Sequence, residues 1–166
     1  MPFENLTPDS KLDWLGTASA AALVSDLAGL PKLFAFRTDS VRGAYAGRAS
    51  QVLEASFEVV SGQRLQIHAS LEDLPHRKNI RQFTVEGPLR DGMLPLVNQL
   101  AKLADATARS FSTHDLSAFT SYGQALASSD PVAQVRLLQT ATVQDPTFSA
   151  SFVDLSQALL ARGDRT

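Results

Sequence analysis

Residues 51–86, QVLEASFEVVSGQRLQIHASLEDLPHRKNIRQFTVE, decide the fold, because apolar and polar residues alternate along them. Two alternating runs, 53–59 and 65–71, flank a Gly-containing turn at 61–63, which predicts a β-hairpin. A third strand is expected at about 80–86. The polar face of this meander should carry the following side chains: Glu54, Ser56, Glu58, Arg64, Gln66, His68, Ser70, Glu72, Gln82 and Thr84. Its apolar face needs a layer of helices.

Two long amphipathic helices are expected on either side of the meander. Apolar residues at helical spacing predict the first over about 11–28, with Gly29 and Pro31 as stop signals. The same spacing predicts the second over about 93–111. A short apolar run at 33–36 has the length of a strand. With a strand at the start of the chain, the first helix and then this run, the order is strand–helix–strand. That order predicts a parallel strand pair joined by a right-handed crossover.

Three shorter helices, at about 117–128, 131–144 and 147–162, are expected to follow a polar joint. The fold class predicted is therefore α+β: a small mixed sheet whose antiparallel meander is covered on one face by two long helices, then an α-helical hairpin. The corresponding domains are 1–112 and 113–166.

The C-terminal third contains an internal repeat. Gly123-Gln124-Ala125-Leu126 matches Ser156-Gln157-Ala158-Leu159 at an offset of 33 residues, and Phe119 and Tyr122 correspond to Phe152 and Leu155. With Asp145-Pro146 between them, these residues resemble the tetratricopeptide repeat (TPR). The resemblance implies that helical hairpins bind a protein or peptide partner. The side chains implied are Tyr122, Gln124, Phe152 and Gln157.

The first two thirds of the chain resemble the TolB amino-terminal-like α/β domain, which is similar to the CsgG and FlgO group of bacterial proteins. The resemblance rests on Pro2-Phe3-Glu4-Asn5, on Leu12, Leu15 and Gly16, on Arg37-Thr38 and on Tyr45-Ala46-Gly47. In many bacterial signalling proteins this domain precedes tetratricopeptide repeats. It therefore implies a signalling or scaffold role, or alternatively periplasmic assembly.

Composition excludes several classes of function. There is no cysteine, so disulfides, thiol nucleophiles and cysteine-based zinc or iron–sulfur sites are ruled out. The net charge of −2 argues against a general nucleic-acid binder. Residues 31–90 nevertheless hold nine basic and six acidic residues. Arg37, Arg42 and Arg48 follow the expected strand at 33–36, and ligands favour such strand ends. A small-ligand sensor for nucleotides or phosphates is the second hypothesis.

No catalytic constellation is present. His68, His76 and His114 lack the spacing of metal ligands, and the nearest cluster is Glu72-Asp73 with His76. No phosphate loop, dinucleotide fingerprint or Gly-x-Ser-x-Gly elbow occurs. We therefore expect no enzyme activity, metal or cofactor. The leading hypothesis is a non-enzymatic protein-interaction or regulatory module.

Partners and location are expected as follows. An open sheet edge could support a homodimer, and the polar sheet face could be solvated or could dock another domain. No stretch reaches the length of a membrane span, and no secretory leader opens the chain. The location is left open, with a cytoplasmic one slightly favoured over a periplasmic one. Both ends look cut, which suggests a fragment of a larger protein.

Overall fold

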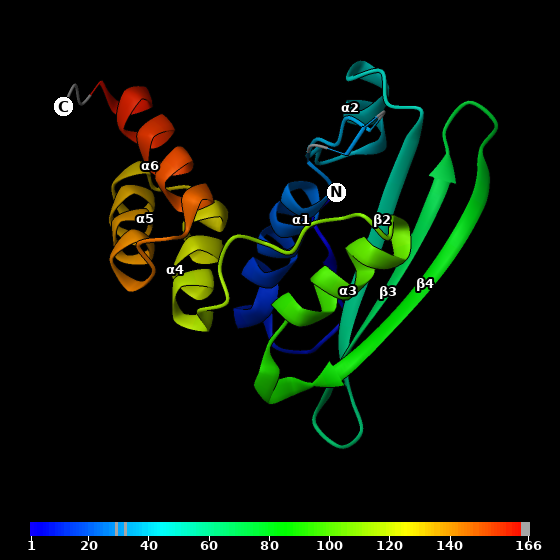
Figure 1. Ribbon diagram of the computed structural model, residues 1–166, viewed down its shortest axis with the longest axis horizontal. Coiled ribbons are helices and arrows are strands. Elements are labelled where there is room, and N and C mark those ends of the chain that lie inside the picture. The colour runs from blue at the N-terminus through cyan, green and yellow to red at the C-terminus, as the bar shows by residue number, and fades with distance from the viewer. Residues whose placement is uncertain (29, 32, 164–166) are drawn as a thin grey trace. The chain divides into compact units, whose positions relative to one another are not determined.

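The computed structural model describes residues 1–28, 30–31 and 33–163. The chain divides into two compact units, Met1–Ser110 and the residues from Phe111 onward. The first is an α/β unit and the second is all helical (Figure 1). The predicted fold class is confirmed.

The first unit is built on a four-stranded mixed sheet in the order β1-β2-β3-β4. The strands are β1 (Glu4–Asn5), β2 (Gln51–Val60), β3 (Arg64–Asp73) and β4 (Lys78–Pro88). β1 pairs in parallel with β2, and the other neighbours pair antiparallel. The meander predicted from the alternating residues is therefore present, with strands longer than predicted because the residues that flank each alternating run also pair.

One face of this sheet forms the core. Ile67 stands opposite Phe57 on one side and Val85 on the other, and all three are buried. Helices α1 (Asp13–Leu27) and α3 (Leu94–Ala104) lie on this side of the sheet (Figure 1). Short 3-10 turns at Ser10–Leu12 and Leu89–Asp91 lead toward them. Both long helices were predicted, and they cover the apolar face as expected.

Two expectations about this unit were wrong. Residues 33–36 form no strand, and β1 pairs with β2 instead. A short apolar run cannot be assigned by periodicity alone, and here the side chain of Phe34 is 86% exposed. The helix at 93–111 ends at Ala104, because Asp105 adopts an extended backbone and its carboxylate accepts the N–H and hydroxyl of Thr107.

A short helix, α2 (Val41–Ala46), precedes β2. The Ser40 hydroxyl caps it by accepting the N–H of Gly43 at 3.1 Å. Ala44 on its inner side is buried with Val52 and Leu74 in a small cluster of its own. This end of the sheet is thereby covered away from the main core.

The second unit contains α4 (Leu116–Ala127), α5 (Pro131–Gln144) and α6 (Ser149–Arg162), within about two residues of the predicted bounds. Asp115 and Asp130 cap the first two helices through their side chains. Phe148 packs edge-on against Phe111 and Tyr122, with ring centroids 5.3 and 4.9 Å away. Aromatic packing therefore contributes to the apolar core of this unit, together with Val135 and Leu138.

Candidate functional site

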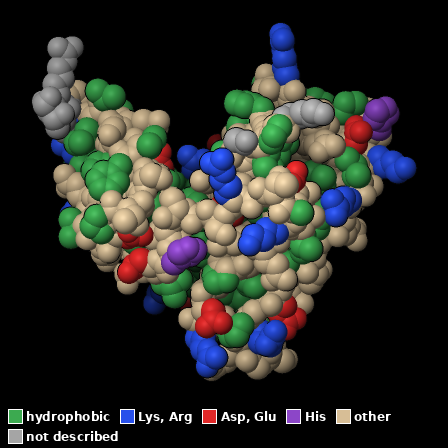
Figure 2. Space-filling view, viewed as in Figure 1, with side chains coloured by type: hydrophobic (Ala, Val, Ile, Leu, Met, Phe, Trp, Pro, Cys, Tyr) green, Lys and Arg blue, Asp and Glu red, His purple; other side chains and the backbone are tan. Residues whose placement is uncertain are grey.

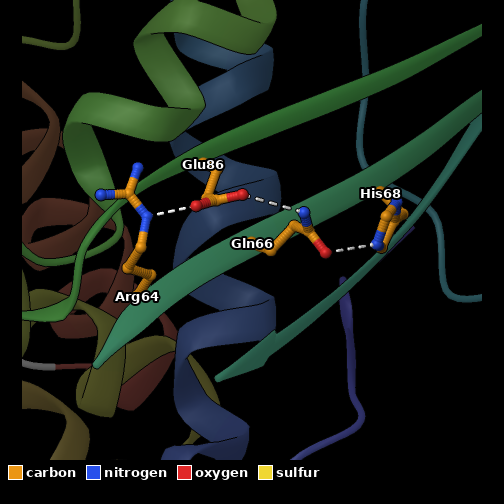
Figure 3. Close-up of polar contacts among 4 residues, drawn as sticks. All are labelled: Arg64, Gln66, His68 and Glu86. Carbon is orange, nitrogen blue, oxygen red and sulfur yellow. Dashed lines mark hydrogen bonds and ion pairs between the residues drawn. The ribbon is translucent and has the colours of Figure 1, made fainter. Parts of the chain in front are cut away.

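The polar face of the sheet carries a connected row of side chains (Figure 3). Glu86 accepts from both Arg64 Nε and Gln66 Nε2, the latter at 3.2 Å. Gln66 Oε1 lies 2.9 Å from His68 Nε2. These residues come from β3 and β4, where the antiparallel register places Gln66 beside Glu86. The face predicted from alternation is therefore confirmed.

His68 is at one end of this row. Its Nδ1 lies 3.2 Å from the Thr84 hydroxyl, and its Nε2 is 3.6 Å from Glu58 Oε1. With Nε2 donating to Gln66, Nδ1 can accept from Thr84. An open hollow of about 380 Å³ lies over His68, Ser56 and Gln82. The side chains of this row therefore hydrogen-bond to one another at the surface, where Arg64, His68 and Glu86 are exposed and Gln66 is half-buried.

The acidic cluster considered for a cation forms a turn. His76 Nδ1 lies 3.0 Å from Asp73 Oδ1, which also accepts the backbone N–H of His76 at 3.0 Å. These hydrogen bonds from His76 lower the pKa of Asp73. Within the described ranges, no group of three His, Asp or Glu side chains could hold a metal ion.

The three arginines predicted to bind a ligand, Arg37, Arg42 and Arg48, do not line one common site. All three are exposed, and Arg48 has a positive φ of 57° just after the end of α2. Arg37 lines a cavity of the first unit, whereas Arg42 and Arg48 are not among its lining residues. Because residues 33–36 form no strand, no strand end gathers these arginines. In Figure 2 the Lys and Arg side chains on the visible face are spread singly over the surface.

The cavity lined by Arg37 has a volume of about 410 Å³. It lies between the C-terminal half of α1, the segment 33–38 and the start of β2. Its lining is mainly apolar and includes Phe3, Leu23, Leu27, Phe36, Val52 and Leu53. Sequence patterns did not reveal it. The one available signal was the alanine-rich stretch of α1, since alanines leave space where larger side chains would fill the core.

A buried carboxylate lies on α1. Asp26 is 1% exposed, and neither carboxylate oxygen has a hydrogen-bond partner among the described residues. Burial raises its pKa to about 7, although the Lys102 ammonium acts in the opposite direction. Asp26 and the buried Ser19 both fall in the apolar stripe of α1. Their place in that stripe could have predicted that both side chains are buried, but the sequence analysis did not use it.

The helical unit places the four predicted partner-binding residues in two environments. Tyr122 is 3% exposed and was wrongly expected to face a partner, because its ring fills the space between helices. Gln124, Phe152 and Gln157 are exposed. Phe152 shares its side of α6 with Val153 and Leu160, which are 56% and 71% exposed. Figure 2 shows hydrophobic side chains at the surface over α5 and α6.

Comparisons with known proteins identify likenesses in structure only. No family model and no curated protein sequence matches the chain. Among solved structures, a variant PelC dodecamer from Paraburkholderia phytofirmans matches with 14% identity and a TM-score of 0.44, covering 64% of this chain and 84% of that one. Lipoprotein GNA1162 from Neisseria meningitidis matches with 16% identity and a TM-score of 0.41, covering 64% and 94%.

None of the helices in the described ranges is both long and apolar enough to span a membrane. Three candidate sites emerge from the described residues: the polar sheet face, the apolar cavity of the first unit and the exposed face of α6.

Proposed function

We propose that the chain is a non-enzymatic protein-interaction module with a regulatory or scaffold role, and that α6 presents the binding surface. One observation carries the proposal: Phe152, Val153 and Leu160 lie exposed along one side of α6. The term "α6 face" is used below for these three residues with Ser156 and Gln157.

The α6 face is uncharged, and its three large side chains are apolar, while Ser156 and Gln157 are polar and neutral. On a helix, residues 152, 153, 156, 157 and 160 project to one side, and none of them is acidic or basic. The opposite side is anchored within the unit, where Ser151 is buried and Asp154 accepts a hydrogen bond from Tyr122. The α6 face is consequently presented on a fixed helix.

Burial of this face would contribute favourable free energy to binding, because Phe152, Val153 and Leu160 are 44%, 56% and 71% exposed. Each large aliphatic or aromatic side chain contributes about 1.5–3 kcal/mol when it is removed from water. An uncharged apolar helix face is best matched by the apolar side of an amphipathic helix. The occupant we propose is therefore an amphipathic helical segment of a protein partner. The helical-hairpin arrangement and its repeat of about 33 residues support this interpretation.

The test is selection of amphipathic helical peptides from a displayed library on the whole chain. Selected peptides should bind the wild type and lose at least about tenfold in affinity to the double variant Phe152→Ser/Leu160→Ser, since two anchors are removed. Ile80→Ser is the matched control, because Ile80 is an exposed apolar residue on β4 of the other unit.

Three results would reject the proposal: no selected peptide, peptides that bind the double variant equally well, or equal losses with the Ile80 control. Sedimentation velocity, which measures self-association, tests whether the occupant is a second copy of the chain. If the wild type self-associates and the double variant is monomeric, the α6 face binds a second copy of the chain and not a partner helix.

A further inference from the structure

The apolar cavity of the first unit is a second, independent candidate for binding. Its volume of about 410 Å³ lies within the range of small-molecule sites, roughly 300–1,000 Å³. Apolar side chains from α1, from the segment 33–38 and from β2 form most of its wall. Such a wall suits a hydrocarbon chain better than a nucleotide, which would need several polar partners.

Two phenylalanines on the segment 33–38 line the cavity. Phe36 lies close against Gly47, where a Cβ would collide with its ring. Phe34 lies next to it with the ring centroids 6.0 Å apart, yet it is 86% exposed. Leu33 is also 43% exposed. Exposed apolar side chains beside an apolar cavity are typical of a ligand-binding surface.

The two charged side chains on the cavity wall, Arg37 and Asp105, differ in whether they already have hydrogen-bond or ion-pair partners. Arg37 makes no ion pair among the described residues. Asp105 is the acidic residue on the wall, and its carboxylate already accepts the backbone N–H and the hydroxyl of Thr107 at 2.8 and 2.6 Å. The guanidinium of Arg37 is therefore the group available to a ligand, and it can hold a carboxylate through paired hydrogen bonds.

We propose that this cavity binds a single acyl chain with a carboxylate head: the chain lies against Leu23, Leu27 and Leu53, and the head is held by Arg37. Arg42 and Arg48 take no part, because neither lines the cavity. The inference is independent of the α6 face, which belongs to the other unit.

The experiment is isothermal titration calorimetry of the whole chain with decanoate, kept below its micelle concentration. Arg37→Gln should weaken decanoate binding about tenfold, since one charge-assisted contact is lost, and should leave binding of uncharged decanol unchanged. Arg42→Gln is the matched control and should leave both affinities as in the wild type. Phe34→Ser should weaken both ligands, because the exposed ring would contact the chain.

A variant whose cavity is filled by a larger side chain gives the decisive comparison with the wild type. Ala20 lines the cavity, and Ala20→Leu should abolish binding of both ligands while circular dichroism confirms the fold. Should that variant unfold, Ala104→Leu fills the cavity from the half-buried end of α3. Binding retained in the filled variant would overturn the proposal. It would also fail if Arg37→Gln bound decanoate as tightly as the wild type.

Two further titrations, with inorganic phosphate and with phosphatidylglycerol vesicles, distinguish a free carboxylate ligand from a phosphate and from a membrane surface. Inorganic phosphate should not bind, because the wall offers one cation and few donors; phosphate binding that decanoate does not displace would overturn the proposal. Binding to phosphatidylglycerol vesicles without any binding of free decanoate would also overturn it, in favour of a membrane-surface contact.

Discussion

The hydroxyl of Tyr122 on α4 donates a 2.7 Å hydrogen bond to Asp154 Oδ2 on α6. This bond joins the first and last helices of the C-terminal unit across 32 residues of sequence. The Tyr122 ring is buried and packs edge-on against Phe148. Tyr122 therefore fixes the position of α6, and with it the orientation of the α6 face proposed to bind a partner.

Replacement of Tyr122 by Phe should destabilise the helical unit by about 1–3 kcal/mol, because Asp154 loses a donor in a partly buried place. Chemical denaturation followed by circular dichroism measures the change. Gln124→Ala is the control: it lies exposed on the same helix and should change the free energy of unfolding by less than about 0.5 kcal/mol. Equal stability of Tyr122→Phe and wild type would show that the hydrogen bond contributes nothing.

Replacement of Gly16 by Ala should destabilise the first unit by about 1–3 kcal/mol. A Cβ at this position would collide with the carbonyl oxygen of Phe3, and the Phe3 N–H donates to Gly16 O at 3.1 Å. Relieving the collision must displace Phe3 from the core, which outweighs the helix propensity gained by Ala, about 1 kcal/mol. Thr17→Ala, the next residue on α1, is the control. Thermal or urea unfolding that ranked Gly16→Ala above the wild type would contradict the close contact.

The meander could be predicted because a single physical rule produces it. Alternation along residues 53–59 and 65–71 forces one face inward, and the observed register pairs Phe57 with Ile67 as that rule requires. The helices follow from spacing and caps in the same way, as with Asp115 and Asp130. These features are local in the sequence and need no knowledge of distant contacts.

The sites could be predicted only in part, because they depend on long-range packing. Arg37, Gln124, Phe152 and Gln157 are exposed, and their binding roles stay predictions. The cavity beside Arg37 arises from α1 and β2 meeting a segment that forms no strand. Tyr122 was misassigned since a repeat pattern marks the same aromatic position whether its ring faces a groove or the core. The proposed domains, 1–112 and 113–166, and the absence of enzyme activity stay predictions.

The polar row of the sheet should contribute little to stability. Arg64 and Glu86 are both exposed, and exposed ion pairs are typically worth about 0–1 kcal/mol. Glu86→Gln should therefore lower the free energy of unfolding by less than about 1 kcal/mol, and added salt should reduce the difference further. The control is Asp91→Asn, another exposed acid with an arginine neighbour. A loss of several kcal/mol for Glu86→Gln would mean that the row is a structural network and not a hydrated surface.

The buried carboxyl of Asp26 should make stability depend on pH. Its pKa is raised from 3.8 to about 7 in the folded protein, because burial penalises the charged form. Between these values the folded state holds a proton that the unfolded state has released. The contribution of Asp26 to stability is thus fully present below the unfolded pKa and is lost as the pH rises toward the folded one.

Replacement of Asp26 by Asn should remove this dependence. From about pH 5 to about pH 8, the wild type should lose roughly 2–3 kcal/mol relative to Asp26→Asn, as each pH unit within the window costs about 1.4 kcal/mol. The measurement is urea unfolding of both proteins across this range, with the difference between them taken at each pH. Asp13→Asn, on the exposed start of the same helix, should track the wild type. If Asp26→Asn followed the same pH profile as the wild type, the carboxylate would have to be ionised and solvated in the folded protein, and the packing of α1 against α3 around it would be looser than the structure shows.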